Sequence, residues 1–216
     1  PPSERPNVAG IGAGGMGGED IKAVAGCGAN IVALCDVDLR RASTIKMFPK
    51  ARVFRDFRKM LDDMDKQIDA VIVGTPDHTH AVAAMAAIKR GKHVYCEKPL
   101  AHSVGEVRAL MKAAQEYKVV TQLGNQGHSY DTIRTFCEWI WDGAIGKVHT
   151  IHCGCEAVNS GIDRLPRLGD KEDVPDELDW DLWLGPAKDR LYHSFYLPGA
   201  WRGWVPFGNG TIGDWL

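Results

Sequence analysis

Short apolar segments alternate with amphipathic helical patterns through the first 124 residues, and this alternation constrains the fold more than any other feature. The strand-like segments are residues 7–12, 30–38, 51–57, 69–76, 92–99 and 119–125. Helical patterns occupy residues 18–26, 58–66, 81–91 and 103–118. The run DAVIVGTP at 69–76 is almost entirely apolar, which is typical of a parallel sheet buried on both faces. The order of elements predicts a right-handed, doubly wound α/β fold.

Composition changes after Gly124, and all seven tryptophans of the chain lie beyond this residue. A helix is expected at 131–143 and a long strand at 146–156, whereas 159–206 is rich in Pro, Gly, Asp and Trp without periodicity. We therefore expect a domain boundary near Gly124, with one domain at 1–124 and a second at 125–216. The second domain is expected to be incomplete, because a lone strand with an apolar face is not stable.

Net charge and hydropathy argue against two classes of partner, nucleic acids and membranes. The 216 residues carry a net charge of -2, which gives no basic field for nucleic acid. No apolar run is long enough to span a membrane, so neither nucleic acid nor membrane is expected as a partner. The six cysteines lie mostly in apolar segments, which favours reduced thiols. The chain begins with Pro1, so a removed leader or a trimmed start is expected, and both a cytoplasmic and an exported location stay open.

Gly12, Gly14 and Gly17 form a G-x-G-x-x-G pattern between the first strand and the first helix. This pattern is typical of a dinucleotide site when an acidic residue follows about 20 positions later, and Asp36 lies 24 positions after Gly12. The first glycine makes the tight turn, the second lets the backbone approach a pyrophosphate, and the third lets helix and strand pack closely. The helix N-terminus supplies free N–H groups and a positive dipole end for that pyrophosphate.

Asp36 indicates which cofactor is preferred. Its carboxylate accepts hydrogen bonds from ribose hydroxyls and repels a 2′-phosphate, which favours NAD over NADP. Arg40 and Arg41 lie a few positions further on and would attract that phosphate, so NADP remains an alternative.

Two further patches follow the fourth and fifth strands, at the edge of the sheet where open α/β folds bind ligands. One contains Thr75 and Pro76, and the other contains Glu97 and Lys98. Lys98 beside a nicotinamide would bind a substrate hydroxyl or help to remove its proton, whereas by itself a loop lysine is only a solvated charge.

Four segments carry a resemblance to a known family: 75–101 (TPDHTHAVAAMAAIKRGKHVYCEKPLA), 142–148 (DGAIGKV), 178–187 (LDWDLWLGPA) and 201–214 (WRGWVPFGNGTIGD). They resemble the Gfo/Idh/MocA oxidoreductases, in particular a bacterial branch. The resemblance implies an N-terminal Rossmann domain and a second domain built on an open, mostly antiparallel sheet. It also implies NAD(P)-dependent hydride transfer to or from a sugar, polyol, cyclitol or related carbonyl compound, in a homo-oligomer.

The motif and the resemblance together indicate the residues of the site. The cofactor-binding residues are expected to be Gly12, Gly14, Gly15, Met16, Gly17, Asp36, Thr75, Pro76, His80, Glu97, Lys98, Asn125 and Gln126. Lys98 and Asp214 are expected to be catalytic, and Lys98, Arg202 and Asp214 to contact substrate.

The chain departs from the family near its end. Family members place a catalytic histidine shortly after an aspartate, but here the sequence ends at Leu216, two positions after Asp214. We therefore expect a partial form whose cofactor half is complete and whose catalytic half is not. Two alternatives stay open, an NAD-dependent redox-neutral glycosidase and a non-catalytic regulatory relative. No metal site is expected, because the His and Cys residues of 149–155 fit no standard zinc spacing.

Overall fold

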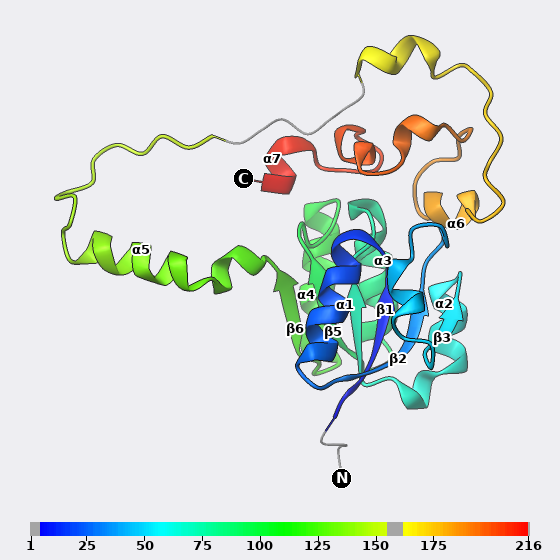
Figure 1. Ribbon diagram of the computed structural model, residues 1–216, viewed down its shortest axis with the longest axis horizontal. Coiled ribbons are helices and arrows are strands. Elements are labelled where there is room, and N and C mark those ends of the chain that lie inside the picture. Colours follow the sequence, from blue (N-terminus) through cyan, green and yellow to red (C-terminus); the bar gives the residue numbers. More distant parts are fainter. Residues whose placement is uncertain (1–4, 155–161, 216) are drawn as a thin grey trace.

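The computed structural model describes residues 5–154 and 162–215, and its central element is a six-stranded parallel sheet (Figure 1). The strands are β1 (Asn7–Ile11), β2 (Asn30–Cys35), β3 (Arg52–Phe54), β4 (Ala70–Val73), β5 (His93–Glu97) and β6 (Thr121–Gly124). Their order in the sheet is β3-β2-β1-β4-β5-β6, with every neighbouring pair parallel. This order is that of a Rossmann fold and confirms the predicted doubly wound α/β architecture.

Helices cover both faces of the sheet (Figure 1). The helices are α1 (Gly15–Gly26), α2 (Phe57–Asp63), α3 (Asp77–Ile88) and α4 (Val104–Glu116), with short 3₁₀ turns η1 (Ser43–Lys46) and η2 (Asp65–Gln67). Ile21 of α1 packs with Leu34 and Ile72 on one face, whereas α2, α3 and α4 share the core of the other face. The strands in the middle of the sheet are therefore buried on both faces, as their apolar sequences predict.

Beyond the sheet, η3 (Gln126–Ser129) leads into α5 (Asp131–Trp141), which extends away from the Rossmann domain (Figure 1). The predicted helix at 131–143 is therefore present. Its apolar side chains Phe136, Trp139 and Trp141 are exposed. No helix among the described residues is long and apolar enough to cross a membrane.

The predicted strand at 146–156 is wrong over residues 146–154, which are exposed and irregular, while Cys155 and Glu156 lie outside the described residues. A strand needs a neighbour to pair its backbone groups, and no strand in the described part of the chain pairs with this segment. The expected mostly antiparallel sheet of the second domain is likewise not formed by the described residues.

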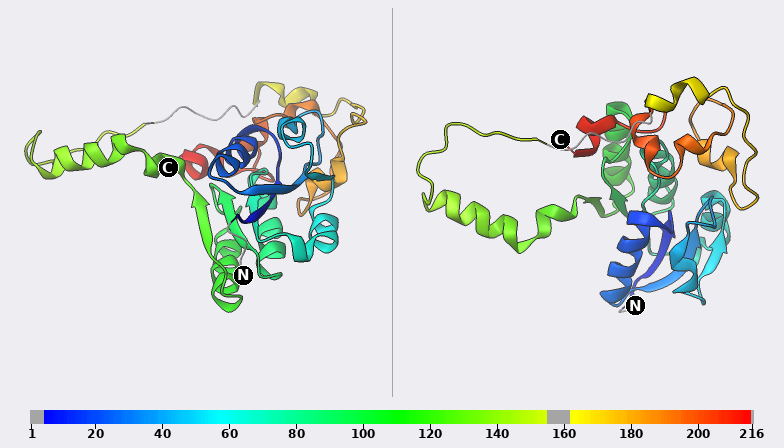
Figure 2. Two further views of the ribbon diagram at one scale, coloured as in Figure 1. Left: turned by 60° about the horizontal axis from the view of Figure 1, so that its bottom comes forward. Right: turned by 45° about the horizontal axis from the view of Figure 1, so that its top comes forward.

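Residues 162–215 form short helices that lie over the carboxyl ends of the strands, as Figures 1 and 2 both show. These are η4 (Ile162–Arg167), α6 (Trp180–Leu184), η5 (Ser194–Tyr196), η6 (Ala200–Gly203) and α7 (Gly210–Trp215). An aromatic cluster around Trp183, Tyr196 and Phe207 holds them together. This segment thus builds its own small core and covers the edge of the sheet where the predicted site residues lie.

Candidate functional site

The turn between β1 and α1 brings three backbones into contact. A Cβ on Gly12, which has φ +88°, would lie 2.5 Å from the carbonyl oxygen of Gly74 at the end of β4. A Cβ on Gly17 would lie 2.4 Å from the carbonyl oxygen of Gly12. Gly74 itself faces Gly17, with only 2.4 Å between its would-be Cβ and the Gly17 Cα. All three positions therefore need glycine, and Gly74 is a residue that the motif alone did not identify.

The next two glycines differ in what surrounds them. A Cβ on Gly14 would lie 2.0 Å from the carbonyl oxygen of Arg41, so its bare backbone accommodates the chain that follows β2. Gly15 has φ +52° and open space where its Cβ would be, and the side chain of Met16 beside it is half exposed. The structure therefore puts the open approach to the backbone at Gly15, where the motif predicted it at Gly14. An accessible helix N-terminus of this kind fits the pyrophosphate of a dinucleotide.

Asp36 lies directly after β2 and faces this turn. Its Oδ2 accepts a hydrogen bond from the Ala13 N–H at 2.8 Å, and its Oδ1 accepts one from the Asp38 N–H at 2.9 Å. Burial raises the pKa of the Asp36 carboxyl, and the two N–H groups partly offset that effect. A carboxylate has about four lone-pair positions, so this one retains acceptor capacity for ribose hydroxyls.

His80 ties together the ends of β4 and β5. One ring nitrogen lies 2.6 Å from the carbonyl oxygen of Thr75 and the other 2.7 Å from that of Pro99, which follows a cis peptide bond after Lys98. The Thr75 hydroxyl accepts a hydrogen bond from the Thr79 hydroxyl at 2.8 Å, and Pro76 precedes α3 as its N-cap. His80 is fully buried, so its contacts fix the two loops rather than face an open site.

Lys98, Asp214 and Arg202 form one charged group. The Lys98 Nζ donates to the Oδ1 of Asp214 at 3.0 Å and to its backbone carbonyl at 2.8 Å. The Nε of Arg202 donates to the Oδ2 at 3.2 Å, and the Lys98 Nζ lies 4.5 Å from the ring centre of Trp215. Asp214 is buried, whereas both cations are about one-third exposed. The chain thus brings together, at the end of β5, the three residues expected to contact substrate.

A second group links α1, β5 and the turn after β6. The Gln126 Nε2 donates to Glu97 Oε1 and lies 3.2 Å from both Asp20 Oδ1 and the Tyr95 hydroxyl. Burial raises the pKa of Glu97 to about 7, and the charge of Asp20 contributes to the rise. Asp20 is itself buried, which raises its pKa, and its Oδ2 lacks a hydrogen-bond partner among the described residues.

Of the two residues expected at the turn after β6, Gln126 belongs to this group and Asn125 is exposed beside it. Gly124 makes room for the group, because a Cβ there would lie 2.3 Å from Glu97 Oε1. Sequence reasoning missed Asp20, which lies on α1, and Tyr95, which lies two positions before Glu97 on β5.

A third set of contacts fastens the C-terminal segment to the start of α3. The backbone N–H and the Nδ2 of Asn209 donate to Asp77 Oδ2 at 3.1 and 3.2 Å. The His78 Nε2 lies 3.0 Å from the carbonyl oxygen of Trp183, and burial lowers the pKa of His78 to about 4. These contacts were not predicted from the sequence. The feature that could have indicated them is Asp77, an aspartate at the first position of α3.

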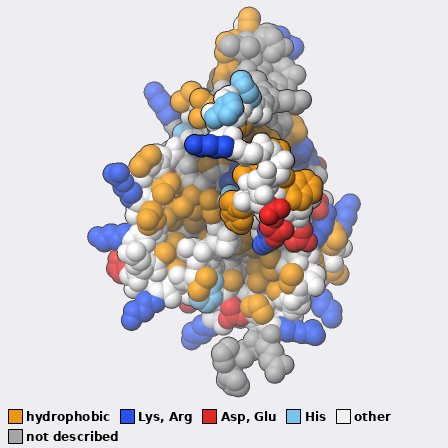
Figure 3. Space-filling view, turned by 90° about the vertical axis from the view of Figure 1, so that its left-hand side faces the viewer, with side chains coloured by type: hydrophobic (Ala, Val, Ile, Leu, Met, Phe, Trp, Pro, Cys, Tyr) orange, Lys and Arg blue, Asp and Glu red, His pale blue; other side chains and the backbone are white. Residues whose placement is uncertain are grey.

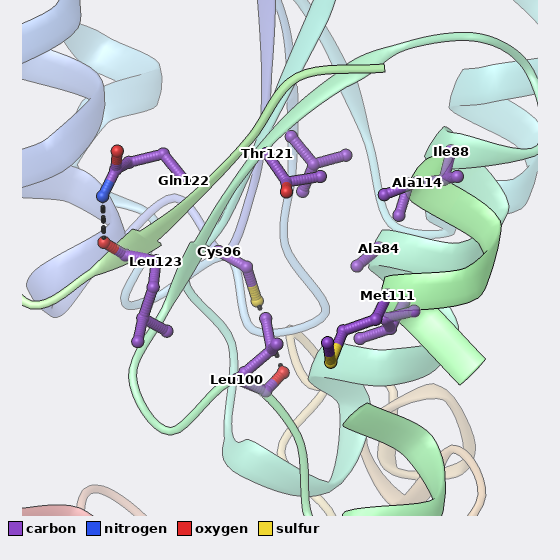
Figure 4. A pocket seen from close by; sticks show the side chains of 11 residues that line it. Ala84, Ile88, Cys96, Leu100, Met111, Ala114, Thr121, Gln122 and Leu123 are labelled. Atoms are coloured by element: carbon purple, nitrogen blue, oxygen red, sulfur yellow. Dashed lines mark hydrogen bonds between the residues drawn. The ribbon is translucent and has the colours of Figure 1, made fainter. Parts of the chain in front are cut away.

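A cavity of about 130 Å³ lies elsewhere, between β5, β6, α3 and α4 (Figure 4). Its lining is apolar apart from Cys96, Thr121 and Gln122, and the Cys96 thiol lies 3.8 Å from the carbonyl oxygen of Leu100. No charged side chain lines this cavity, so it does not offer the proton-transfer groups that Lys98 and its partners offer.

Two family models match this chain. Residues 6–125 match the Gfo/Idh/MocA oxidoreductase family, NAD-binding Rossmann fold, and residues 160–215 match the C-terminal alpha/beta domain of such oxidoreductases.

Individual relatives are similar over part of their length. The inositol 2-dehydrogenase of Rubrobacter xylanophilus is 37% identical over 116 residues, which cover 53% of this chain and 33% of that protein. The levoglucosan dehydrogenase of Pseudarthrobacter phenanthrenivorans is 36% identical over 93 residues, which cover 43% and 23%. The structure of myo-inositol 2-dehydrogenase from Lactobacillus plantarum superposes with a TM-score of 0.61 at 25% identity, covering 67% of this chain and 43% of that one.

The chain therefore spans a third or less of the two curated relatives described above. The glycine turn, Asp36 at the end of β2 and the family match over more than half of the residues agree with one another. The chain belongs to the Gfo/Idh/MocA oxidoreductase family, and residues 6–125 are its NAD-binding Rossmann domain.

Proposed function

We propose that the protein is an NAD-dependent oxidoreductase that transfers a hydride between the nicotinamide and a sugar, polyol or cyclitol. The observation that carries this proposal is the contact of Lys98 with Asp214 at the carboxyl end of β5, on the same edge of the sheet as the glycine turn. Ligands of open α/β folds bind at this edge. The names of the relatives, inositol 2-dehydrogenase and levoglucosan dehydrogenase, support a polyol or sugar as substrate.

The residues at this edge fit the parts of a dinucleotide. Gly15 and Met16 at the N-terminus of α1 would hold the pyrophosphate, and Asp36 the adenosine ribose. Thr75 and Pro76 would line the path of the cofactor, with His80 buried behind them and holding their loop, and Glu97 with the turn at Asn125 and Gln126 would lie at the nicotinamide end. NAD, when bound, supplies the hydride acceptor or donor.

Lys98 would bind the oxygen of the reacting carbon. Its ammonium donates hydrogen bonds and would stabilise the negative charge that develops on a hydroxyl oxygen as its proton leaves. Asp214 would hold that ammonium in place through its Oδ1 and its backbone carbonyl. Arg202, which is about one-third exposed and lies 4.3 Å from the Trp201 ring, would bind a further hydroxyl of the substrate.

The test is formation of NADH by the chain on a panel of inositols, anhydrosugars and aldoses. The matched variants are Lys98→Met and Lys112→Met, the second on the exposed face of α4. NADH formation that Lys98→Met loses and Lys112→Met retains, with NAD binding unchanged in both, supports the proposal. Retention of the full rate by Lys98→Met contradicts the role proposed for Lys98, and release of an aglycone without net NADH identifies the redox-neutral alternative.

We also propose that the protein forms a homo-oligomer through α5. Phe136 and Trp139 on this helix are 57% and 62% exposed, and Ile145 after it is 70% exposed. Figure 3 looks at the molecule from the side on which α5 lies and shows groups of hydrophobic side chains among Lys and Arg side chains. Sedimentation of the chain and of its Trp139→Glu variant tests this, since a charge in a buried contact shifts an oligomer toward the monomer.

A further inference from the structure

Arg40 follows Asp36 in the loop after β2 and is held by Asp38. The Arg40 Nε donates to Asp38 Oδ1 and its Nη2 donates to Asp38 Oδ2, both at 2.7 Å. The backbone N–H of Arg40 donates to the same carboxylate at 3.2 Å. This is the two-pronged geometry in which an arginine binds a carboxylate most strongly. The Asp38 carboxylate is 6% exposed, so little solvent competes for it.

The loop is fixed on its other side by the C-terminal segment. The Leu39 N–H donates to the Glu177 carbonyl at 3.2 Å, and the Asp179 N–H donates to the Val37 carbonyl at 2.9 Å. Asp38 and Leu178 form an antiparallel bridge between these two hydrogen bonds. Residues 37–39 therefore have a set conformation, and Asp38 is not free to turn away from Arg40.

The position of this ion pair bears on the choice between NAD and NADP. In a Rossmann fold the acidic residue after the second strand binds the ribose hydroxyls of NAD, and an arginine nearby is what accommodates the 2′-phosphate of NADP. Arg40 is such an arginine, two positions beyond Asp38 and four beyond Asp36. Two of its side-chain nitrogens, Nε and Nη2, donate to Asp38 instead of to a phosphate.

We propose that Asp38 is a specificity-determining residue, which excludes NADP by holding the guanidinium of Arg40. Asp38 acts through Arg40 and is therefore a positioning residue. Discrimination against the 2′-phosphate then has two parts, the repulsion by Asp36 and the withdrawal of the Arg40 guanidinium, which would otherwise help to offset that repulsion. This inference rests on the proposed dinucleotide site and concerns only how that site selects its cofactor.

The test is a calorimetric titration of the chain with NAD⁺ and NADP⁺, together with Asp38→Ala and Asp38→Asn variants. The expected result is that both variants lower the ratio of the NADP⁺ to the NAD⁺ dissociation constant, by about tenfold for Asp38→Ala, because a freed charge-assisted contact is worth on the order of one factor of ten. The dissociation constant for NAD⁺ should change by less than about a factor of two to three, since Asp36 keeps its partners.

Two double variants separate the role of Arg40 from the simple loss of a negative charge. Asp38→Ala with Arg40→Met should return the ratio to that of the unsubstituted chain, whereas Asp38→Ala with Arg41→Met should keep the altered ratio. Arg40→Met alone should not raise NADP⁺ affinity, because it removes a cation that Asp38 already holds and leaves the Asp38 carboxylate without that partner.

The outcomes distinguish two failures. If the unsubstituted chain binds neither cofactor, the proposed function is wrong. If it binds NAD⁺ and neither Asp38 variant changes the ratio, or if Arg40→Met does not reverse the change, the inference about Asp38 alone is overturned. Asp38→Asn preserves the shape of the side chain, so NAD⁺ binding by this variant shows that the fold is intact.

Discussion

Lys98 and Asp214 are separated by 116 positions in the chain, yet the Lys98 Nζ lies 3.0 Å from the Asp214 Oδ1. The pair joins the last helix of the C-terminal segment to the end of β5 in the Rossmann domain. Asp214 also accepts a hydrogen bond from Arg202, so one buried carboxylate holds two cations from different segments. The proposed catalytic group and the attachment of the C-terminal segment therefore depend on the same side chain.

Asp214→Asn should loosen the C-terminal segment. The substitution leaves the Lys98 and Arg202 cations with a neutral partner, and breaking a largely buried ion pair costs on the order of 1–3 kcal/mol after discounting for the exposed cations. We expect faster proteolytic cleavage within residues 162–215 and a lower melting temperature. The control is Asp131→Asn, which removes an exposed pair with Arg134 at 3.7 Å and should change neither measurement. Equal effects of the two variants would contradict the role assigned to Asp214.

Gly14→Ala should abolish NAD binding or unfold the turn. Its Cβ would lie 2.0 Å from the Arg41 carbonyl, a backbone atom that cannot move without displacing the loop after β2. Overpacking of this kind costs about 1–3 kcal/mol or more. Gly26→Ala is the matched control, because nothing lies within 4 Å of its Cβ. Thermal unfolding and NAD titration of both variants check the prediction, which fails if Gly14→Ala binds NAD as the unsubstituted chain does.

Glu97→Gln should remove part of the pH dependence of stability. Burial raises the pKa of Glu97 to about 7 from an ordinary value of 4.5, so the folded protein holds this proton more tightly than the unfolded chain does. The contribution of Glu97 to stability is therefore full below about pH 4.5 and is lost as the pH rises toward 7.

We expect Glu97→Gln to be more stable than the unsubstituted chain at pH 8, by roughly 1–3 kcal/mol, with a smaller difference or none at pH 5. Denaturant unfolding at the two pH values measures this difference. Glu116→Gln on the exposed end of α4 serves as the control. A Glu97→Gln variant that is destabilised equally at both pH values would show that the pKa of Glu97 is not raised by its burial as described.

Patterns within short stretches of sequence predicted the strands of the sheet and the glycine turn of the cofactor site. Alternating apolar segments identified the six strands, and the spacing from Gly12 to Asp36 identified the turn and the carboxylate at the end of β2. The strand predicted at 146–156 is wrong over the described residues 146–154, because strand formation depends on a distant partner that the segment itself does not encode.

Contacts between distant segments were less predictable. Gln126 bonds Asp20 across 106 positions and Asn209 bonds Asp77 across 132, and no periodicity links either pair. Asp214 was expected only through the family resemblance. Lys98 was also indicated by its place after the fifth strand, at the edge of the sheet that binds ligands, although a lysine in a loop is by itself only a solvated charge. The geometry of the site thus comes from packing, while the residue types within it are visible in the sequence.

Gly124→Ala should disturb the Glu97 group without touching the glycine turn. The new Cβ would lie 2.3 Å from Glu97 Oε1 and 2.9 Å from the Tyr95 hydroxyl, so one of these side chains must move. Because Glu97 is buried, moving it breaks its contact with Gln126 and opens the group to water, which would bring its pKa back toward 4.5. We expect a loss of stability of about 1 kcal/mol together with a flatter pH dependence between 5 and 8, resembling that of Glu97→Gln.

Gly127→Ala, whose Cβ has nothing within 4 Å, should leave both properties unchanged. If Gly124→Ala lowers stability equally at every pH, the substitution acts through crowding alone, and the carboxyl group of Glu97 is not what Gly124 accommodates.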